Sequence, residues 1–313
     1  MEYRNMGSSG LQVTLAGLGC NNFGMRIDAE QTRAVVHRAL DEGITLFDTA
    51  DIYGGRGASE EMLGKALGGR RQEIVLASKF GMVMGEGPYL RGASRRYIMA
   101  ACEASLRRLG TDYLDLYQVH TPDPATPEQE TLEALDTLVR AGKVRYVGCS
   151  NYAGWQLADA MGISRERGLA SYISAQNEYN LLNRAVEQEL VPACQHFAVG
   201  ILPFFPLASG FLTGKYQHGV EPPKGTRLAT MRPLADRVLT EGNFAKLSRL
   251  EQFARARERS LLELAMSWLA AQPQVASVIS GATRPEQVSE NVKALGWKLG
   301  AEDLAEVDKI TRN

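Results

Sequence analysis

LFDTADIYGG, residues 46–55, decides the fold of this chain. A short apolar run stops at the carboxylate of Asp48, and Tyr53 follows a few residues later with two glycines behind it. Short apolar runs of this kind are typical of buried strands. In α/β barrels the catalytic groups lie where such strands pass into the following loops. The stretch therefore predicts a buried strand that delivers Asp48 and Tyr53 to a functional face.

The same alternation of apolar strand, loop and amphipathic helix continues along the chain on both sides of this stretch. Strands are predicted at residues 15–18, 45–47, 74–78, 114–119, 144–149, 172–175, 200–202 and 275–279. Helices are predicted at residues 29–42, 59–67, 95–109, 127–141, 154–161, 184–197, 250–271 and 285–294. Strands that alternate with helices lie parallel, and about eight such units predict a single α/β domain, a (β/α)8 TIM barrel over residues 1–313.

Two segments stand outside this repeat. Residues 2–5 and 12–14 are β-prone and are joined by GSSG, which predicts an N-terminal β-hairpin. Residues 209–245 form a long segment rich in glycine, proline and charge after the seventh predicted strand. Long loops in compact domains are usually functional or disordered. We expect a lid over a ligand, with a surface insertion as the alternative.

An open doubly wound sheet is the competing fold, and its usual phosphate-binding motifs are missing. The G-x-G stretch that begins at Gly17 has Asn22 in the third glycine position, and the one that begins at Gly55 has Glu60 there. The chain has no GxxxxGK[ST] loop. These absences favour the barrel.

Composition limits the class of function. The chain is 44 % hydrophobic and 23 % charged with a formal net charge of −1, which is typical of a soluble globular enzyme. Basic residues are scattered rather than clustered, so we expect no nucleic-acid partner. The four cysteines form no CxxC pair, so we expect free thiols and no metal site. The start MEYRNMGSSG has no apolar signal core and no apolar run is long enough for a membrane span, so we expect a cytoplasmic protein without a membrane partner.

Polar side chains follow successive predicted strands. They are Asp48, Lys79, His120, the pair Ser150 and Asn151, and Gln176. Taken singly, Asp48 could cap a helix, Lys79 could lie on the surface, and His120 and Tyr53 could simply pack. Together they must converge on one face of a barrel, where Asp48 and Lys79 can pair because buried charges need partners.

Tyr53 poses a chemical problem, because a free phenol has a pKa of about 10. A lysine ammonium nearby lowers that pKa, and Asp48 would hold Lys79 charged and in place. His120 can hydrogen-bond a substrate oxygen or tune the phenol. The set predicts a positioned general acid beside a donor to an oxyanion. No side chain donates a hydride, so the chemistry requires a cofactor.

Seven further segments carry a resemblance to a known family: GASEEMLGKAL, IVLASKFG, TDYLDLYQVHTPDP, GKVRYVGCSNY, SAQNEYNLLNR, PLASGFLTGKY and ISGATRPEQVSEN. With LFDTADIYGG, the chain resembles the aldo-keto reductases over essentially its whole length, and GATRPEQ resembles the bacterial and potassium-channel β-subunit branches. The resemblance implies a (β/α)8 barrel that uses NADP(H) without a Rossmann domain. It also implies a catalytic tetrad of Asp48, Tyr53, Lys79 and His120.

The resemblance further implies a cofactor site. The nicotinamide carboxamide would be bound by Ser150, Asn151 and Gln176, and its ring would stack on Phe204. The pyrophosphate would be held by Leu207, Ser209, Gly210 and Lys215, and the whole cofactor would be clamped by Arg227. The adenosine end would be bound by Gly281, Thr283, Arg284, Gln287, Glu290 and Asn291. The chain departs from the family at three places. Phe205 stands where many members have serine, and Gly281 and Gln287 stand where other branches have lysine and arginine.

The sequence thus predicts an NADP(H)-dependent reductase of aldehydes or ketones, either monomeric or homo-oligomeric, with a small carbonyl or alcohol substrate. An adaptable, partly apolar substrate pocket is expected from Phe23, Met25, Phe80, Met82, Met84 and Tyr89. Two alternatives stay open. One is a barrel aldolase with Lys79 as a Schiff base. The other is an NADP(H)-binding regulatory or redox-sensing protein with slow turnover.

Overall fold

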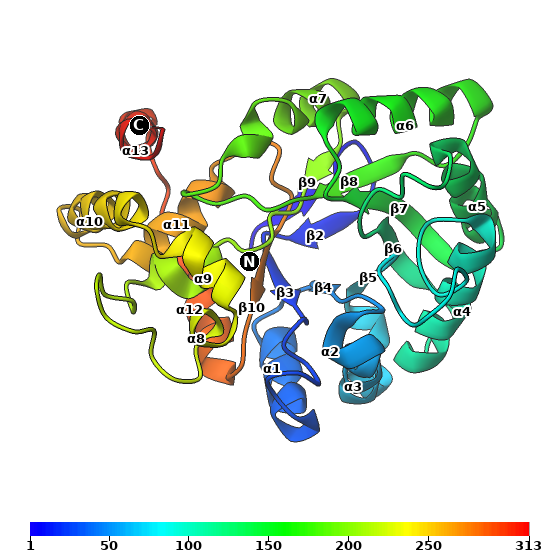
Figure 1. The fold of residues 1–313 in the computed structure, drawn as a ribbon, viewed down its shortest axis with the longest axis horizontal. Coiled ribbons are helices and arrows are strands. Elements are labelled where there is room, and N and C mark those ends of the chain that lie inside the picture. Colours follow the sequence, from blue (N-terminus) through cyan, green and yellow to red (C-terminus); the bar gives the residue numbers. More distant parts are fainter. Residues whose placement is uncertain (313) are drawn as a thin grey trace.

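The computed structural model describes residues 1–312, and eight parallel strands form its centre (Figure 1). They are β3 (Ala16–Gly19), β4 (Leu46–Asp48), β5 (Val75–Phe80), β6 (Leu114–Val119), β7 (Val144–Ser150), β8 (Tyr172–Gln176), β9 (Gly200–Ile201) and β10 (Val278–Gly281). Their order is β10-β3-β4-β5-β6-β7-β8-β9. The amide of Ile201 donates to Gln274 at 2.7 Å, and the amide of Ile279 donates to Pro203 at 3.2 Å, so the two sheet edges also meet. The predicted barrel is confirmed.

The strands are wrapped by helices whose apolar sides face the sheet. They are α1 (Ala29–Asp41), α3 (Ala58–Leu67), α4 (Arg95–Leu109), α5 (Glu128–Arg140), α6 (Gly154–Arg167), α7 (Leu190–Phe197), α11 (Leu261–Ala270) and α12 (Pro285–Ala294). Local sequence fixes where they begin. Asp28 and Gln31 form a capping box at the start of α1, and the Ser94 hydroxyl accepts from the amide of Tyr97 at the start of α4.

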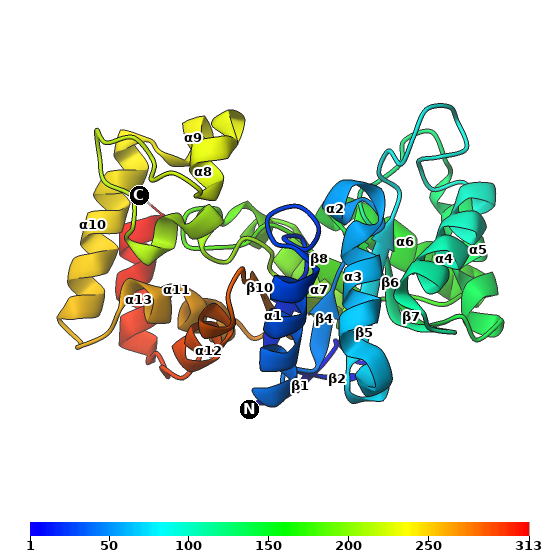
Figure 2. The same cartoon turned by 90° about the horizontal axis from the view of Figure 1, so that it is seen from below.

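The predicted N-terminal hairpin is confirmed as β1 (Tyr3–Asn5) paired antiparallel with β2 (Gln12–Thr14). It lies across one end of the barrel, opposite the long connections that rise from the other end (Figure 2). Met6 and Val13 are fully buried there in a cluster with Leu46 and Leu116. The hairpin therefore closes the amino end of the barrel, and the carboxyl ends of the strands are left for ligands.

Several predicted helix boundaries were wrong, each for a local reason. The helix predicted at residues 250–271 is two helices, α10 (Glu241–Arg255) and α11, because Ser260 starts a new capping box with Glu263. The helix predicted at residues 184–197 opens with the short turn η2 (Ala185–Glu187), and α7 begins at Leu190. Helix α6 runs past residue 161 to Arg167 and ends at Gly168, whose φ of 64° suits a C-cap.

The expectations for the last part of the chain also need correction. The last strand lies at Val278–Gly281 rather than at residues 275–279. The segment after β9 is not an unbroken loop, since it holds the short helices η3 (Ala208–Thr213), α8 (Arg227–Thr230) and α9 (Arg232–Val238). Helix α13 (Ala301–Thr311) was not predicted, and it packs on α10 with Val307 and Ile310 buried.

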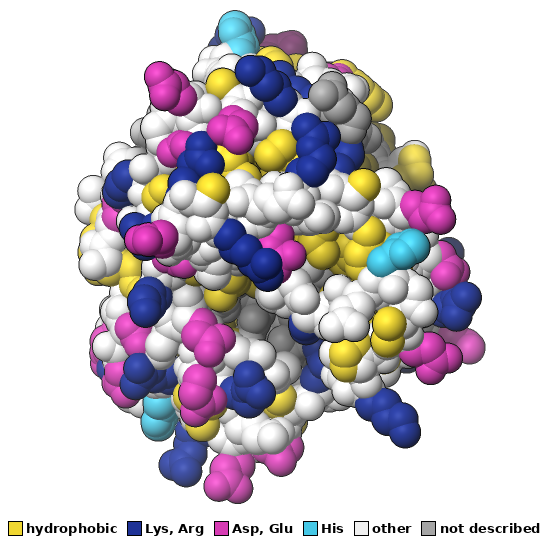
Figure 3. Space-filling view, turned by 90° about the vertical axis from the view of Figure 1, so that its left-hand side faces the viewer, with side chains coloured by type: hydrophobic (Ala, Val, Ile, Leu, Met, Phe, Trp, Pro, Cys, Tyr) yellow, Lys and Arg dark blue, Asp and Glu magenta, His cyan; other side chains and the backbone are white. Residues whose placement is uncertain are grey.

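Figure 3 shows the face over α10 and α13, where basic and acidic side chains are interspersed. Ion pairs account for part of this pattern, for example Arg257 with Asp303 at 2.7 Å. Within residues 1–312 no helix has both the length and the apolar character needed to cross a membrane.

Candidate active site

A cavity of about 690 Å³ opens at the carboxyl ends of the barrel strands and extends under the segment after β9. Asp48, Tyr53 and His120 line it, and Lys79 lies behind them with no exposed surface. Asp48 ends β4, and Lys79 lies near the end of the adjacent β5, so parallel pairing brings the two side chains to one place. The structure therefore brings the four predicted tetrad residues together.

The centre of the site is a buried ion pair. The Lys79 ammonium donates to Asp48 Oδ2 at 2.6 Å and to the carbonyl of Thr49 at 3.0 Å. The other carboxylate oxygen, Asp48 Oδ1, accepts from the amides of Gln176 at 2.9 Å and Gln118 at 3.2 Å. The expected pairing of Asp48 with Lys79 is confirmed. Gln118 was missed, because a buried glutamine in mid-strand carries no sequence signal.

Tyr53 lies against this pair. The Lys79 ammonium is 5.0 Å from the centre of the Tyr53 ring, and the His120 ring meets it edge-on at 5.6 Å between centroids. Burial raises the pKa of Tyr53 above its ordinary value, and the Lys79 charge offsets only part of that rise. The predicted lowering by Lys79 is therefore present, but burial of the phenol outweighs it. Tyr53 holds its proton at neutral pH, as a proton donor must.

The charges of Lys79 and His120 differ in a way that defines their roles. Burial favours neutral Lys79, but its interactions with the Asp48 carboxylate and with Tyr53 outweigh burial and raise the lysine pKa. Burial, and then the Lys79 charge, lower the pKa of His120 to about 3. The backbone of His120 is held on both sides, since its amide donates to the carbonyl of Phe80 and its carbonyl accepts from the Asn151 side chain. A charged lysine and a neutral imidazole result.

Next to the tetrad, the predicted nicotinamide residues line the cavity together. They are Ser150, Asn151, Gln176 and Phe204. The Ser150 hydroxyl donates to the carbonyl of Gln176 at 2.7 Å, and the Asn151 side chain donates to Ser150 Oγ at 3.1 Å. Asn151 has a φ of 60°, a left-handed conformation that asparagine tolerates better than most residues. The result is a polar wall whose groups are fixed by one another.

Further along the cavity the chain forms a concave backbone turn. Ala208, Ser209 and Gly210 all have positive φ, at 44°, 60° and 87°. Consecutive residues of this kind can turn their amides toward one point and make a nest for an anion. The Ser209 hydroxyl is buried and has no partner among the described residues. The Lys215 ammonium lies 2.7 Å from where a Cβ on Gly210 would be, so the predicted pyrophosphate segment forms a cationic cradle.

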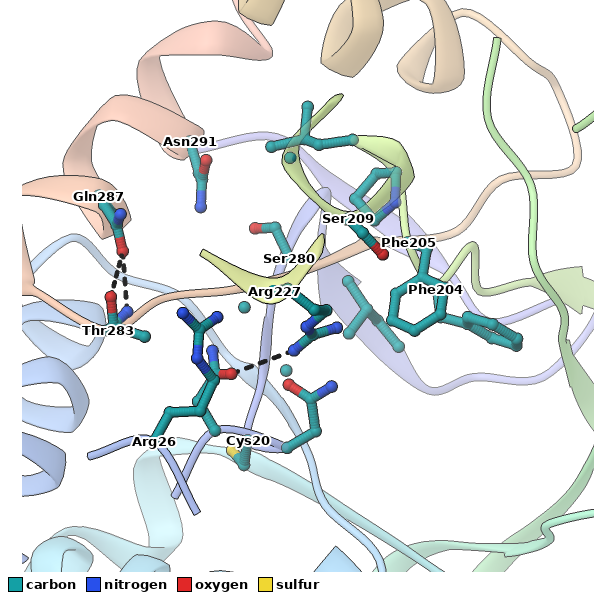
Figure 4. A pocket seen from close by; sticks show the side chains of 18 of the residues that line it. Cys20, Arg26, Phe204, Phe205, Ser209, Arg227, Ser280, Thr283, Gln287 and Asn291 are labelled. Atoms are coloured by element: carbon teal, nitrogen blue, oxygen red, sulfur yellow. Dashed lines mark hydrogen bonds between the residues drawn. The ribbon is translucent and has the colours of Figure 1, made fainter. Parts of the chain in front are cut away.

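The remaining cavity wall comes from β10 and α12 (Figure 4). The amide of Thr283 donates to Gln287 at 2.8 Å, and its hydroxyl lies 3.1 Å from the same oxygen. Gly281 faces Asn22, whose amide nitrogen would lie 3.1 Å from a Cβ at Gly281. Arg284, Glu290 and Asn291 complete this end. All the predicted cofactor residues therefore line one cavity with Asp48, Tyr53 and His120.

Two arginines connect different loops in the wall of the cavity, and the sequence predicted only one of them. Arg227, which was predicted, donates to Asn22 Oδ1 at 3.1 Å, and its guanidinium lies 5.2 Å from the centre of the Phe205 ring. Arg26, which was missed, donates to the carbonyl of Gly225 at 2.6 Å. These contacts join loops far apart in sequence, so no local motif announces Arg26.

Residues 16–312 match the Aldo/keto reductase family. The chain belongs to this family. It is 39 % identical to "L-glyceraldehyde 3-phosphate reductase" of Escherichia coli, over 99 % of this chain and 92 % of that protein. It is 37 % identical to "Probable voltage-gated potassium channel subunit beta" of Arabidopsis thaliana, over 94 % of this chain and 91 % of that protein. It is 33 % identical to "Aldo-keto reductase YhdN" of Bacillus subtilis, over 100 % of this chain and 94 % of that protein.

The structure does not bring the predicted substrate residues of this aldo/keto reductase together in the cavity, and their role stays a prediction. None of the six lines the cavity: Phe23, Met25, Phe80, Met82, Met84 and Tyr89. Phe23 and Phe80 are fully buried in the core, and Phe80 packs on Tyr117 with 4.8 Å between ring centroids. Met25, Met82 and Tyr89 are exposed on loops, and Met84 packs partly against the core. An aromatic just past a strand end can face either side of the barrel wall, which the sequence does not distinguish.

Proposed function

We propose that this aldo/keto reductase uses NADP(H) to reduce aldehydes or ketones to alcohols, with Asp48, Tyr53, Lys79 and His120 as its catalytic tetrad. The observation that carries the proposal is the buried ion pair of Lys79 and Asp48 directly behind the Tyr53 phenol. It places a fixed positive charge where a phenolate would form. The cavity in front of the ion pair is lined by residues that range from β4 to α12.

Each tetrad residue has a distinct task in the proposed reaction. When bound, the nicotinamide supplies the hydride that reduces the carbonyl carbon. Tyr53 gives its proton to the carbonyl oxygen as general acid, and Lys79 stabilises the phenolate that remains. Asp48 keeps Lys79 charged and oriented. His120, being neutral, donates a hydrogen bond to the substrate oxygen and does not act as an acid.

The charge of the cavity supports NADP(H) over NAD(H). Five basic side chains line it: Arg26, Lys215, Lys224, Arg227 and Arg284. Burial, and then the charges of Arg26, Arg227 and Arg284, lower the pKa of Lys215, so these groups feel one another. Arg284 precedes α12 beside Thr283, where a helix N-terminus also favours an anion. A cofactor with an added 2′-phosphate offers these cations more partners than NAD(H).

Arg284→Gln is expected to raise the Kd for NADPH by about 10- to 100-fold and to leave the Kd for NADH nearly unchanged, since one charge-assisted hydrogen bond contributes about 1.5–3 kcal/mol. Fluorescence titration with both cofactors measures the two constants. Lys293→Gln, an exposed change on the same helix, is the control. Equal losses for NADPH and NADH would show that Arg284 does not read the 2′-phosphate.

The test of the proposed reaction is NADPH oxidation with a panel of aldehydes, followed by absorbance. The panel includes glyceraldehyde 3-phosphate and unphosphorylated glyceraldehyde, because one relative is named for reducing the L-form of the phosphorylated aldehyde. NADPH oxidation that depends on an added aldehyde supports the reductase. NADPH binding without any turnover on the panel would contradict it.

Two alternative functions can be distinguished from the proposed reductase by experiments on the same site. Relatives named as potassium-channel β subunits make a regulatory protein with slow turnover the main alternative, and NADPH binding without turnover would favour it. A Schiff-base aldolase needs a neutral lysine, whereas the interactions with Asp48 and Tyr53 raise the pKa of Lys79. Borohydride trapping of Lys79 with a carbonyl substrate would support the aldolase instead. The cytoplasmic location and the choice between monomer and homo-oligomer stay predictions.

A further inference from the structure

A second group of buried ionisable side chains lies outside the cavity, behind the strand that carries Lys79. Its central member is Asp51, which is 1 % exposed and does not line the cavity. The Tyr97 hydroxyl of α4 donates to Asp51 Oδ2 at 3.1 Å. The other oxygen, Asp51 Oδ1, is buried without a hydrogen-bond partner among the described residues. Such a carboxylate is costly in its charged form.

The neighbours of Asp51 do not supply a cation for it. Glu60 of α3 is fully buried, and it accepts from Ser78 Oγ at 2.5 Å and from Arg108 Nε at 2.6 Å. Arg108 of α4 is therefore engaged by Glu60. Two other groups face Asp51 or Glu60: the Tyr117 hydroxyl of β6, which is buried without a partner among the described residues, and the Cys102 thiol of α4, whose pKa burial raises to about 12.

The group therefore contains two carboxyl groups, those of Asp51 and Glu60, and one guanidinium, that of Arg108. Burial, and then the charge of Glu60, raise the pKa of Asp51 to about 7, although the Tyr97 hydrogen bond and Arg108 act in the opposite direction. The geometry supports the same direction, because the Arg108 guanidinium lies 2.6 Å from the Glu60 carboxylate and Asp51 Oδ1 has no partner among the described residues. Asp51 therefore holds a proton below neutral pH and loses it above.

Asp51 is connected to the catalytic residues through the backbone. Its amide donates to the carbonyl of Lys79 at 3.1 Å, which extends the pairing of β4 with β5. The amide of Tyr53, two residues later, donates to the carbonyl of Ala50 at 3.1 Å. Ser78, which holds Glu60, immediately precedes Lys79 and points to the opposite side of the strand. Asp51 thus lies on the backbone between Lys79 and Tyr53 and is hydrogen-bonded to the first of them.

We propose that Asp51 is a positioning residue, held protonated behind the Lys79 strand, and that losing its proton displaces the loop that places Tyr53. The catalytic part of this inference rests on the proposed reductase function. The displacement follows from repulsion between the Asp51 and Glu60 carboxylates in a space that one arginine neutralises only once. No covalent step is involved.

The test compares wild type with Asp51→Asn, which mimics the protonated carboxyl, and with Glu61→Gln, an exposed change one residue beyond Glu60. The wild-type kcat should fall as pH rises through about 7, by up to about 100-fold, the loss that a misplacement of about 1 Å can cause. Asp51→Asn should remove that step, and Glu61→Gln should keep it. The pKa of His120 is about 3 and burial raises the pKa of Tyr53, so neither produces a step near neutrality.

Tyr97→Phe provides a second variant in case Asp51→Asn folds poorly. The Tyr97 hydrogen bond lowers the pKa of Asp51, so its removal should move the step in kcat to higher pH. A step that stays in place in both Asp51→Asn and Tyr97→Phe would overturn the inference, since a merely structural role of Asp51 predicts the same profile in every variant.

Stability gives a readout that needs no turnover. Because the folded-state pKa of Asp51 is raised, its stabilising proton is fully present below the pKa of an unfolded aspartate, about 4, and is lost as pH rises through about 7. The Tm of Asp51→Asn should therefore rise relative to wild type over this window and then run parallel to it. A Tm difference between Asp51→Asn and wild type that stays constant with pH would contradict the inference that Asp51 holds a proton. Absence of turnover in wild type at every pH, with this Tm pattern intact, would count against the reductase function and not against the proton.

Discussion

Tyr53→Phe is expected to lower kcat for carbonyl reduction by about 10²–10⁴-fold, the usual contribution of a positioned general acid. The substitution removes one hydroxyl and keeps the ring, so the contacts with Lys79 and His120 persist. Hydride arrival would leave the substrate oxygen negatively charged without a proton donor. Single-turnover oxidation of NADPH measures this step, and a separate titration measures NADPH binding, which should change by less than about twofold.

The matched control is Tyr113→Phe. Tyr113 precedes β6 at the amino end of the barrel, and its hydroxyl donates to Gln72 at 2.9 Å, far from the cavity residues in the fold. This variant should keep wild-type kcat. A Tyr53→Phe enzyme that turns over at a similar rate to wild type would remove the phenol from the mechanism. Loss of NADPH binding in that variant would instead assign Tyr53 to the cofactor site.

The convergence of the tetrad could be predicted because parallel strands impose it. Asp48, Lys79 and His120 lie at or just past the ends of three adjacent strands, and parallel pairing brings such ends to one face. Eight apolar segments with helices between them specify that pairing without any knowledge of side-chain contacts. The direction of the Tyr53 pKa could not be predicted, because it depends on how completely the loops exclude water.

Contacts between loops that are distant in the sequence could not be predicted, for a different reason. Arg26 is separated from Gly225 by about two-thirds of the chain, and only the closed barrel brings them to 2.6 Å. The same holds for Arg227 and Asn22, whose side chains are joined by a hydrogen bond of 3.1 Å. Phe23 and Phe80 show the limit for apolar side chains, since a residue type alone does not say which side of the barrel wall it faces. Burial of Asp51 and Glu60 is likewise a property of the packed helices α3 and α4.

Lys79→Met is expected to abolish reduction and to lower the free energy of unfolding by about 3–5 kcal/mol, the cost of leaving one member of a buried ion pair alone. Lys79 is fully buried and Asp48 is 3 % exposed, so solvent does not screen the remaining carboxylate. Urea unfolding measures the loss. Lys65→Met, on the exposed side of α3, should change stability by less than about 0.5 kcal/mol.

The double variant Asp48→Asn, Lys79→Met separates the structural from the chemical role of the pair. Replacing both charges removes the carboxylate that would otherwise lack an ion-pair partner. The introduced carboxamide keeps an oxygen that accepts from the amides of Gln118 and Gln176. Stability should therefore recover most of what Lys79→Met loses. Activity should not recover, because no positive charge faces the Tyr53 ring to stabilise its phenolate. A double variant that regains both would mean that Lys79 serves only to neutralise Asp48, and one that regains neither would mean that the pair holds the strand ends together.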